Sequence, residues 1–177
     1  MPDDRRNAET FEALAIPLLA PLYNFAHWLT RNRDEAEDLV QETYVKALKG
    51  FPSFTPGTNF RAWMYRILRN TFLTSRTGLK TTVSLDDDEN PVAEPAVNDD
   101  PESLLFARAD QEEIGRALEQ LPVAHREIIL LCDVEEMSYK EIAELVGIPI
   151  GTVMSRLSRA RRAMRSLLKA TTQGVRQ

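Results

Sequence analysis

The sequence has very little cysteine and no long apolar run. Cys132 is the single cysteine among 177 residues, which excludes an internal disulfide and suits a reducing compartment. It ends the apolar stretch 128–132, so we expect a small buried core residue rather than a reactive thiol. The stretch MPDDRRNAET has no apolar signal core, and no apolar run approaches membrane-spanning length. We therefore expect a cytoplasmic protein without membrane insertion.

Alternating β-branched residues, the pattern of strands, are also missing over any useful length. Helix-forming residues dominate, and the hydrophobic fraction of 43% is ordinary for a globular protein. A chain of this length allows one domain or two small ones. The sequence therefore predicts an all-α fold.

Basic charge is in deficit overall, because the formal net charge is −5. The charges are segregated, however. Between Asp86 and Asp110 only Arg108 opposes a run of carboxylates, whereas the segment after Met154 is almost purely basic. Because local charge governs binding, the negative total does not exclude a nucleic-acid ligand.

Residues 138–168 have the pattern of a helix-turn-helix. Apolar residues at helical spacing precede Gly147 and Pro149, which end a short first helix. A second helix begins at Ile150. Its expected buried stripe comprises Val153, Leu157, Ala160, Met164 and Leu168.

The other face of that second helix is polar and basic. It carries Thr152, Ser155, Arg156, Arg159 and Arg162, with Arg161 and Arg165 beside them. Arg can bind guanine edges in pairs or hold phosphates, while Thr and Ser let the backbone come close. A merely solvated basic face is the alternative. The turn, the change of polarity and the position together favour binding in a major groove.

Residues 33–50 form a second candidate site. Asp34 is the expected N-cap and Gly50 the expected end of a helix. Its expected buried stripe comprises Ala36, Leu39, Val40, Tyr44, Ala47 and Leu48. The opposite face carries Asp34, Asp38, Gln41 and Glu42. The helix dipole explains acidic residues in the first turn but not their continuation past Gln41, which indicates a surface for a basic partner.

An enzymatic role for these carboxylates finds no support in the rest of the sequence. No nucleophile–base pair, Gly-rich phosphate loop or metal-ligand spacing accompanies them. We therefore predict no catalytic residues, no metal site and no cofactor.

Aromatic and Arg side chains alternate farther along the chain. The loop after Phe51 contains the exposed-looking Phe54 and Phe60, and a helix over 61–76 carries Arg61, Arg66, Arg69 and Arg76 among aromatic residues. This combination suits unstacked single-stranded bases. The alternative is a core role for the apolar members of the helix, and the pattern alone favours neither. Those members are Trp63, Tyr65, Ile67, Leu68 and Phe72.

The segments before and between these candidate sites complete the predicted domain organisation. Residues 11–29 predict a helix that begins or kinks near Pro17 and Pro21. Residues 79–102 contain three prolines, an acidic run and no periodicity, which predicts an extended linker. A helix over 103–121 follows, and Pro122 starts the next. We expect domains over 1–78 and 101–177, with the linker at 79–100.

Three blocks of sequence follow one another in a specific order: DEAEDLVQETYVKALKGF, FRAWMYRILRNTF and LPVAHREIILLCDVEEMSYKEIAELVGIPIGTVMSRLSRARRAMR. They resemble region 2.2, regions 2.3 to 2.4 and region 4 of the extracytoplasmic-function (ECF) group of bacterial sigma-70-type RNA polymerase sigma factors. The acidic linker stands where larger sigma factors have a long connecting domain. The resemblance implies a dissociable specificity subunit, not an enzyme, that directs core RNA polymerase to promoters and initiates transcription in a stress response.

The resemblance also implies residue roles. The face that docks on the coiled coil of the polymerase β′ subunit matches Asp38, Gln41 and Glu42. The positions that capture unstacked bases of the −10 element match Phe54, Trp63, Arg66 and Asn70. The recognition-helix positions that read the −35 duplex match Thr152, Ser155, Arg156, Arg159 and Arg162.

Further partners are implied in the same way. They are the polymerase β flap, promoter DNA and an anti-sigma factor. The segments FTPGTNFRAWMYRIL and PIGTVMSRLSRARR are most similar to the branch that answers thiol-oxidative stress. The anti-sigma factors of that branch contain a redox-sensitive zinc site, and the zinc belongs to the partner.

A stand-alone helix-turn-helix regulator is the main alternative function. It needs a dimerisation element and a palindromic site, and the sequence offers no spare helix for one. A purely structural adaptor leaves the basic recognition helix unexplained.

Overall fold

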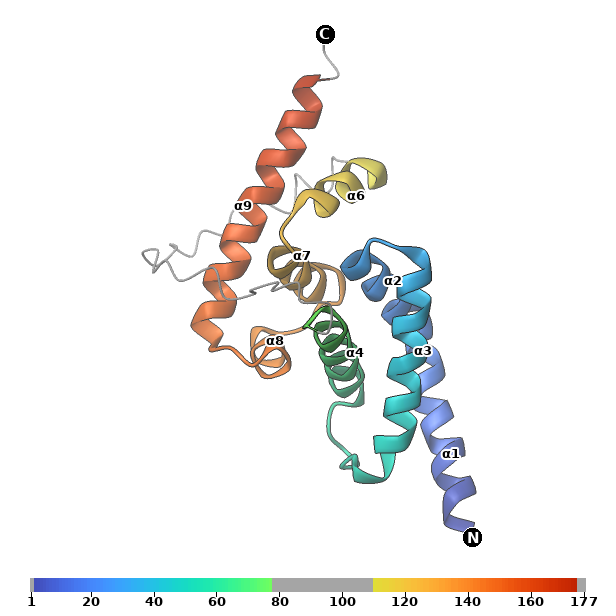
Figure 1. Ribbon diagram of the computed structural model, residues 1–177. Helices are drawn as coiled ribbons and strands as arrows, with labels where there is room; N and C mark the ends of the chain where they lie inside the picture. Colours follow the sequence, from blue (N-terminus) through green and yellow to red (C-terminus); the bar gives the residue numbers. More distant parts are fainter. Residues whose placement is uncertain (1, 78–109, 175–177) are drawn as a thin grey trace. The chain divides into compact units, whose positions relative to one another are not determined.

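The computed structural model describes residues 2–77 and 110–174, and within these ranges it contains helices and turns but no strand (Figure 1). The prediction of an all-α fold is therefore confirmed. The described residues form two compact units, unit 1 (residues 2–77) and unit 2 (residues 110–174). The predicted linker at 79–100 and the first part of the predicted helix at 103–121 lie outside the described residues.

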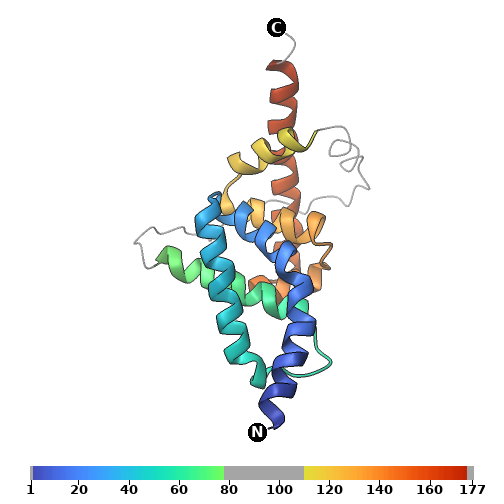
Figure 2. The same ribbon diagram turned by 90° about the vertical axis from the view of Figure 1, so that its right-hand side faces the viewer.

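Unit 1 is a bundle of four α-helices and two short 3₁₀ turns. In chain order they are α1 (Pro2–Ala15), η1 (Ile16–Leu18), α2 (Leu19–Thr30), α3 (Arg33–Gly50), η2 (Phe51–Ser53) and α4 (Phe60–Thr77). Helix α3 packs against both α2 and α4, and Figure 2 shows α4 crossing α3. The core between them is apolar, and its fully buried members include Leu22, Phe25, Met64, Tyr65 and Leu68.

The break predicted near Pro17 is present as η1, which separates α1 from α2. Helix α1 begins at Pro2, well before the start at Phe11 that the apolar pattern predicts. Residues 5–10 give no apolar signal because most of them are exposed. The Tyr44 hydroxyl of α3 donates a hydrogen bond to the Ala15 carbonyl oxygen (2.6 Å), which ties the end of α1 to α3. Burial raises the pKa of Tyr44 to about 12.

The N-cap of α3 is Asn32, not Asp34 as predicted. The Asn32 backbone is extended, and its side chain accepts a hydrogen bond from the Glu35 backbone N–H (3.0 Å). Four members of the predicted stripe are buried: Ala36, Leu39, Val40 and Ala47. Tyr44 is half-buried, and Leu48 was predicted wrongly because its side chain is 51% exposed.

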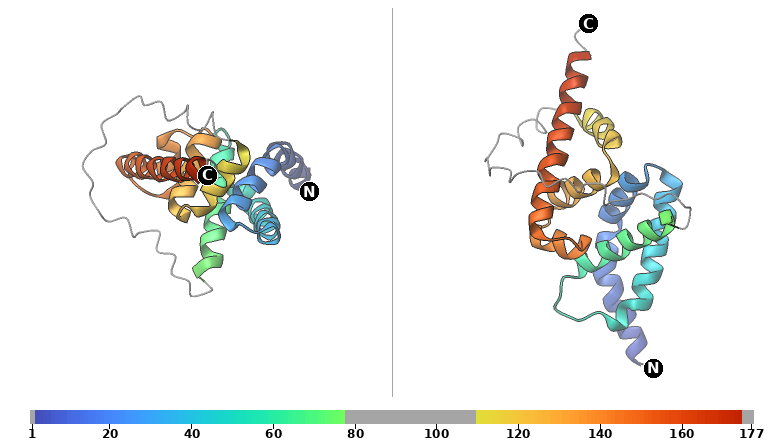
Figure 3. Two further views of the ribbon diagram at one scale, coloured as in Figure 1. Left: turned by 90° about the horizontal axis from the view of Figure 1, so that it is seen from above. Right: turned by 60° about the vertical axis from the view of Figure 1, so that its left-hand side comes forward.

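Unit 2 is built around one long helix. Helices α6 (Gln111–Gln120), α7 (Val123–Ile129) and α8 (Tyr139–Val146), with the π-helical turn η3 (Leu130–Val134), precede α9 (Ile150–Gly174). Helices α6, α7 and α8 all pack against α9, whose length is visible in Figure 3. The predicted stripe of α9 is buried throughout, so this prediction is confirmed: Val153, Leu157, Ala160, Met164 and Leu168.

A buried arginine closes the C-terminal end of α6. Arg126 of α7 is 2% exposed. Its Nε donates to the Leu118 carbonyl oxygen (2.8 Å), and one Nη donates to the Leu121 carbonyl oxygen (2.9 Å). The last carbonyls of a helix have no partner within the helix, so the guanidinium satisfies groups that burial leaves without water.

Cys132 lies in η3 and is half-buried rather than fully buried. Beside it, Arg161 of α9 forms a two-point ion pair with Asp133 (3.2 and 2.5 Å) and places one Nη 3.8 Å from the Cys132 Sγ. Burial is the main reason that the pKa of Cys132 is raised to about 11. The Asp133 carboxylate raises it further, and Arg161 opposes the shift.

We expect Cys132 to react slowly with iodoacetamide in the native protein. Its pKa of about 11 lies well above the ordinary thiol value of 9.0, so the thiolate fraction at pH 8 is about a hundredfold lower than in the unfolded chain. Labelling rates with and without urea, followed by mass spectrometry, measure this ratio. The raised pKa also makes the free energy of unfolding depend on pH. The contribution of the neutral Cys132 thiol is fully present below pH 9.0 and is lost as the pH rises through about 11. Equal native and unfolded rates contradict the assignment.

Candidate functional site

The acidic face of α3 is fully accessible in unit 1. Asp38, Gln41 and Glu42 are all exposed, and their spacing of three and four residues puts them on one side of the helix. Glu42 pairs with Lys46 one turn later (3.1 Å). The carboxylate of Asp38 has no ion pair of this kind in the part of the chain that the structure describes.

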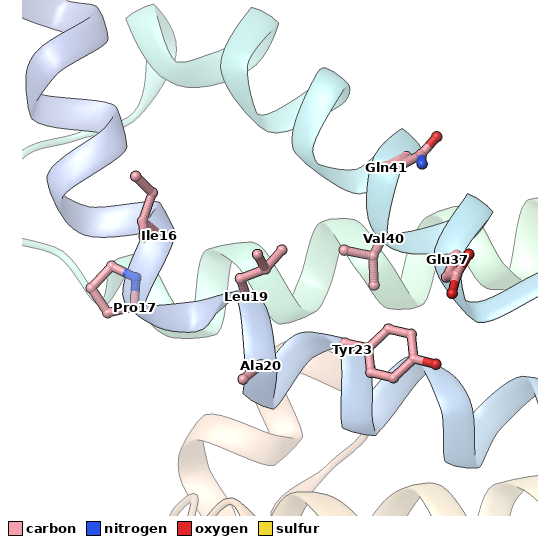
Figure 4. Close-up of a pocket in the computed structure, with 8 residues that line it drawn as sticks. All are labelled: Ile16, Pro17, Leu19, Ala20, Tyr23, Glu37, Val40 and Gln41. Carbon is pink, nitrogen blue, oxygen red and sulfur yellow. The ribbon is translucent and has the colours of Figure 1, made fainter. Parts of the chain in front are cut away.

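Two grooves border this face, one on each side of α3. Gln41 lies at the edge of an apolar groove of about 610 Å³ between α3 and the start of α2, which Figure 4 shows in close-up. Asp38 and Glu42 line a groove of about 260 Å³ between α3 and the C-terminal end of α4. In the second groove Arg76 pairs with Glu35 (2.9 Å) and its guanidinium lies over the Phe72 ring.

Phe54 and Trp63 belong to a cluster of aromatic rings at the base of the loop before α4. Their ring centroids are 5.1 Å apart, and both side chains are half-buried. Phe54 also stacks on Phe51 (5.9 Å) and meets the edge of Phe60 (5.3 Å). Phe60, which the sequence suggested to be exposed, is buried, because it is the first residue of α4 and points into unit 1.

The exposed face of α4 carries the other two predicted residues of this site. Arg66 and Asn70 are exposed one turn apart, and Trp63 precedes them by one turn, so the three lie along one side of the helix. The opposite side of α4 packs into the core of unit 1. The sequence left open whether the apolar residues of this helix are core residues, and for Tyr65, Leu68 and Phe72 they are.

The remaining arginines of α4 do not share the face of Arg66. Arg69 is buried, and Arg61 and Arg76 lie over the rings of Tyr65 and Phe72. The sequence alone does not separate Arg66 from the others, because all four alternate with aromatic residues.

The helix-turn-helix of unit 2 has the local chemistry that the sequence predicts. Ser138 caps α8 through a capping box with Glu141, and Gly147 ends it with a left-handed backbone (φ 78°). The Pro149 carbonyl then accepts hydrogen bonds from the N–H groups of Thr152 and Val153 (3.0 and 3.1 Å), which start α9. The turn therefore fixes the direction of α9 relative to α8.

The predicted DNA-reading residues of α9 differ in accessibility. Arg162 is exposed, and Thr152, Ser155 and Arg159 are half-buried. The Ser155 hydroxyl donates to the Thr152 carbonyl oxygen (3.2 Å). Arg161, placed beside this face by the sequence, is held by Asp133.

Arg156 corrects the predicted face of α9. Its side chain is 6% exposed, and its Nε has no hydrogen-bond partner among the described residues. At about 100° per residue, Arg156 lies about 60° from Val153 around the helix, at the edge of the apolar stripe, whereas Arg162 lies about 180° away. The aliphatic stem of Arg156 therefore extends the buried face.

Neither a metal centre nor a membrane span is found in the described ranges. No group of three or more His, Cys, Asp or Glu side chains in residues 2–77 and 110–174 is placed to hold a metal ion. Within the same ranges, no helix is both long and apolar enough to cross a membrane.

Both units match a known protein family. Residues 16–81 match Sigma-70 region 2, and residues 111–164 match Sigma-70 region 4. The first match covers α2 to α4 with the acidic face and the aromatic loop, and the second covers α6 to α8 and the polar face of α9.

Individual relatives carry the same family name. The chain is 36% identical over 149 residues to the ECF RNA polymerase sigma factor SigE of Mycolicibacterium smegmatis, covering 83% of this chain and 57% of that protein. It is also 36% identical over 144 residues to the ECF RNA polymerase sigma factor EcfG of Rhodopseudomonas palustris (81% and 77%). It is 31% identical over 160 residues to the RNA polymerase sigma factor YlaC of Bacillus subtilis (88% and 90%).

Solved structures agree with these matches. The sigma factor RpoE of Bartonella quintana, solved in complex with the anti-sigma factor NepR, superposes with a TM-score of 0.71 at 33% identity and covers 91% of this chain and 98% of that chain. CnrH, solved with the cytosolic domain of CnrY, has the same fold, with a TM-score of 0.60 at 23% identity over 94% and 92% of the two chains. From the two matched regions and these relatives, we conclude that the chain belongs to the ECF group of the sigma-70 family of RNA polymerase sigma factors.

Proposed function

We propose that this chain is the promoter-specificity subunit of a bacterial RNA polymerase, with polymerase docking and −10 capture in unit 1 and −35 recognition in unit 2. The observation that carries the proposal is the pairing, in one chain, of an exposed acidic helix face with a helix-turn-helix whose second helix is basic. Neither feature acts on a substrate by itself, so the role is one of binding and not of catalysis.

Helix α3 is the proposed docking surface for the β′ coiled coil. Asp38, Gln41 and Glu42 offer carboxylate and amide oxygens to a basic partner, and they are exposed. The apolar groove beside Gln41 adds Ile16 and Leu19, which are 63% and 49% exposed. An apolar floor beside a charged rim is typical of a protein interface.

The aromatic loop and α4 are the proposed −10 site. Phe54 and Trp63 offer ring faces and edges on which an unstacked base can pack. Arg66 and Asn70 lie on the exposed side of α4, where Arg66 suits a phosphate and Asn70 suits a base edge.

Helix α9 is the proposed −35 reader. Thr152, Ser155, Arg159 and Arg162 lie on the accessible sector of its N-terminal half. Unit 1 and unit 2 each make a modest contact with the promoter. Because the two units are joined in one chain, binding of one unit raises the effective concentration of the other unit at its own site.

Run-off transcription with core polymerase tests the proposal. Core enzyme is assayed with and without this protein on a pool of genomic promoter fragments. Discrete new transcripts support the proposal, and binding of the isolated protein to a palindromic site without polymerase supports the stand-alone regulator instead. No complex with core polymerase at all overturns the proposal.

We expect Arg159→Ala to weaken −35 binding by about five- to a hundredfold, because each good base-edge contact contributes about 1–3 kcal/mol. Footprinting of the holoenzyme on a defined promoter measures the loss. Lys169→Ala is the matched control, since Lys169 is an exposed cation on the same helix, five residues beyond the region 4 match. Equal footprints for Arg159→Ala and wild type contradict the groove assignment.

Arg156→Ala is expected to behave differently from Arg159→Ala. The buried Arg156 side chain packs at the edge of the core, so its removal lowers the melting temperature of unit 2 as well as promoter binding. Circular dichroism melting separates the two effects.

An anti-sigma factor is the proposed regulator. The neighbouring structure of the sigma factor RpoE contains such a partner, the anti-sigma factor NepR. The assignment to the thiol-oxidative branch, with a zinc-containing anti-sigma factor, stays a prediction. The zinc content of the purified complex with the cognate anti-sigma factor tests it.

A further inference from the structure

An aromatic cluster joins the N-terminal helix to the loop of the proposed −10 site. It contains Phe11 of α1, Phe51 of η2, Phe54 of the loop, and Phe60 and Trp63 of α4. Phe11 meets the Phe51 ring edge-on at 5.3 Å and the Phe60 ring at 6.1 Å. These are the geometries that aromatic pairs prefer.

Phe11 contacts two of the three rings that hold Phe54. Phe54 stacks on Phe51 with an interplanar angle of 11° and meets Phe60 at 86°. Phe11 is 5% exposed and does not itself reach the surface on which a base packs. Its contact with Phe54 therefore runs through the other two rings.

The hydrogen bonds around Phe54 are local, so its position relative to α4 depends on the ring contacts. The Phe54 N–H donates to the Phe51 carbonyl oxygen (2.9 Å), and the Thr58 N–H and hydroxyl both donate to the Thr55 carbonyl oxygen (3.3 and 2.7 Å). These bonds shape the turns inside the loop. At the end of the loop, Asn59 accepts hydrogen bonds from the N–H groups of Ala62 and Trp63 (3.0 and 3.1 Å), which caps α4. The contacts of Phe51 and Phe54 with Phe60 and Trp63 are made by their rings.

Helix α1 has no role assigned by the family match, which starts at residue 16. Most of the side chains that the structure describes in α1, residues 5–15, are exposed, and the buried apolar ones among them are Phe11 and Ala15. Ala15 is anchored through the Tyr44 hydrogen bond. Phe11 is therefore buried against the aromatic cluster. Removing its ring leaves a cavity that Phe51 and Phe60 border.

We propose that Phe11 is a positioning residue for −10 capture, through which α1 holds the Phe51 and Phe60 rings and thereby sets the Phe54 ring that receives an unstacked base. The proposal rests on the proposed function of the loop. It adds α1 to the elements that determine base preference.

The test compares Phe11→Leu with Phe25→Leu. Both remove one buried ring from unit 1, but the aromatic neighbour of Phe25 is Tyr65, outside the cluster. Each variant is assembled with core polymerase and exposed to single-stranded DNA oligonucleotides with a randomised central stretch, and captured molecules are sequenced. Phe54→Ala is included as the reference for loss of the capture ring, and circular dichroism melting checks that each variant is folded.

We expect Phe11→Leu to flatten the base preference at the same position as Phe54→Ala and to weaken capture of the best oligonucleotide by about five- to tenfold, within the range of one base–ring stack. Phe25→Leu is expected to keep the wild-type preference at a similar loss of melting temperature. The double variant Phe11→Leu/Phe54→Ala should be no worse than Phe54→Ala alone, because both changes act through one ring.

Two results overturn the inference in distinguishable ways. A preserved preference in Phe11→Leu, with a flattened one in Phe54→Ala, removes the role of Phe11 and leaves the capture function intact. An unchanged preference in Phe54→Ala, or no enrichment by the wild-type holoenzyme, removes the capture function itself.

Discussion

Replacing both Asp38 and Gln41 with lysine is expected to abolish transcription by the reconstituted holoenzyme. Both side chains lie exposed on one face of α3, so the double change replaces an acidic docking surface with a basic one. Placing like charges opposite each other across an interface costs several kcal/mol. The affinity for core polymerase should therefore fall at least about a hundredfold. Fluorescence anisotropy of labelled protein titrated with core polymerase measures the affinity, and run-off transcription measures the consequence.

The matched control is the double variant Asn7→Lys/Glu9→Lys. It makes the same change in net charge on exposed residues of α1 in the same unit, at least seven positions before Ile16, where the apolar groove begins. We expect its affinity for core polymerase to stay within about twofold of wild type, because exposed charges far from an interface act mainly through screened long-range fields. Equal losses in both variants indicate a general charge effect and contradict docking through α3.

The helices of this protein were predictable where apolar spacing and turn chemistry agree. The stripe from Val153 to Leu168 and the left-handed Gly147 follow directly from the sequence, because a helix needs one buried face and a residue that tolerates positive φ at its end. Helix α1 was missed before Phe11 for the opposite reason. Most of residues 5–10 are exposed, so no apolar periodicity marks them.

The sequence predicts which helix faces carry the candidate site residues, but it does not predict how exposed each side chain is. Helical spacing places Asp38, Gln41 and Glu42 on one exposed face without further information. It does not reveal that Arg156 is buried, since a long aliphatic stem lets an arginine at the edge of a stripe join the core. Nor does it reveal that Phe11 contacts Phe51, because contacts between residues forty positions apart depend on how α1 packs.

Replacing Arg126 with methionine is expected to unfold unit 2 selectively. Methionine keeps much of the buried apolar volume but removes the guanidinium donors of the Leu118 and Leu121 carbonyls (2.8 and 2.9 Å in the wild type). The Leu118 carbonyl then keeps the longer bond from the Leu121 N–H (3.2 Å). A buried carbonyl without a partner costs about 1–3 kcal/mol, and a hydrogen bond to a charged group contributes about 1.5–3 kcal/mol, so the two losses together cost about 3 kcal/mol or more. A unit of this size has a total stability of only a few kcal/mol, and its melting temperature should fall by more than about 10 °C.

The same substitution at Arg116 separates this capping role from a loss of charge. Arg116 is exposed on α6, where its Nε donates to the Glu112 carbonyl oxygen (3.3 Å), a group that water also reaches. Arg116→Met should therefore change the melting temperature by no more than a few degrees. Because Arg126 lies outside unit 1, Arg126→Met should still bind core polymerase through α3 while losing the −35 footprint. Retention of the −35 footprint in a protein that melts like the wild type contradicts the capping role. Loss of polymerase binding along with the footprint instead shows that docking requires a folded unit 2, and this contradicts the assignment of docking to unit 1 alone.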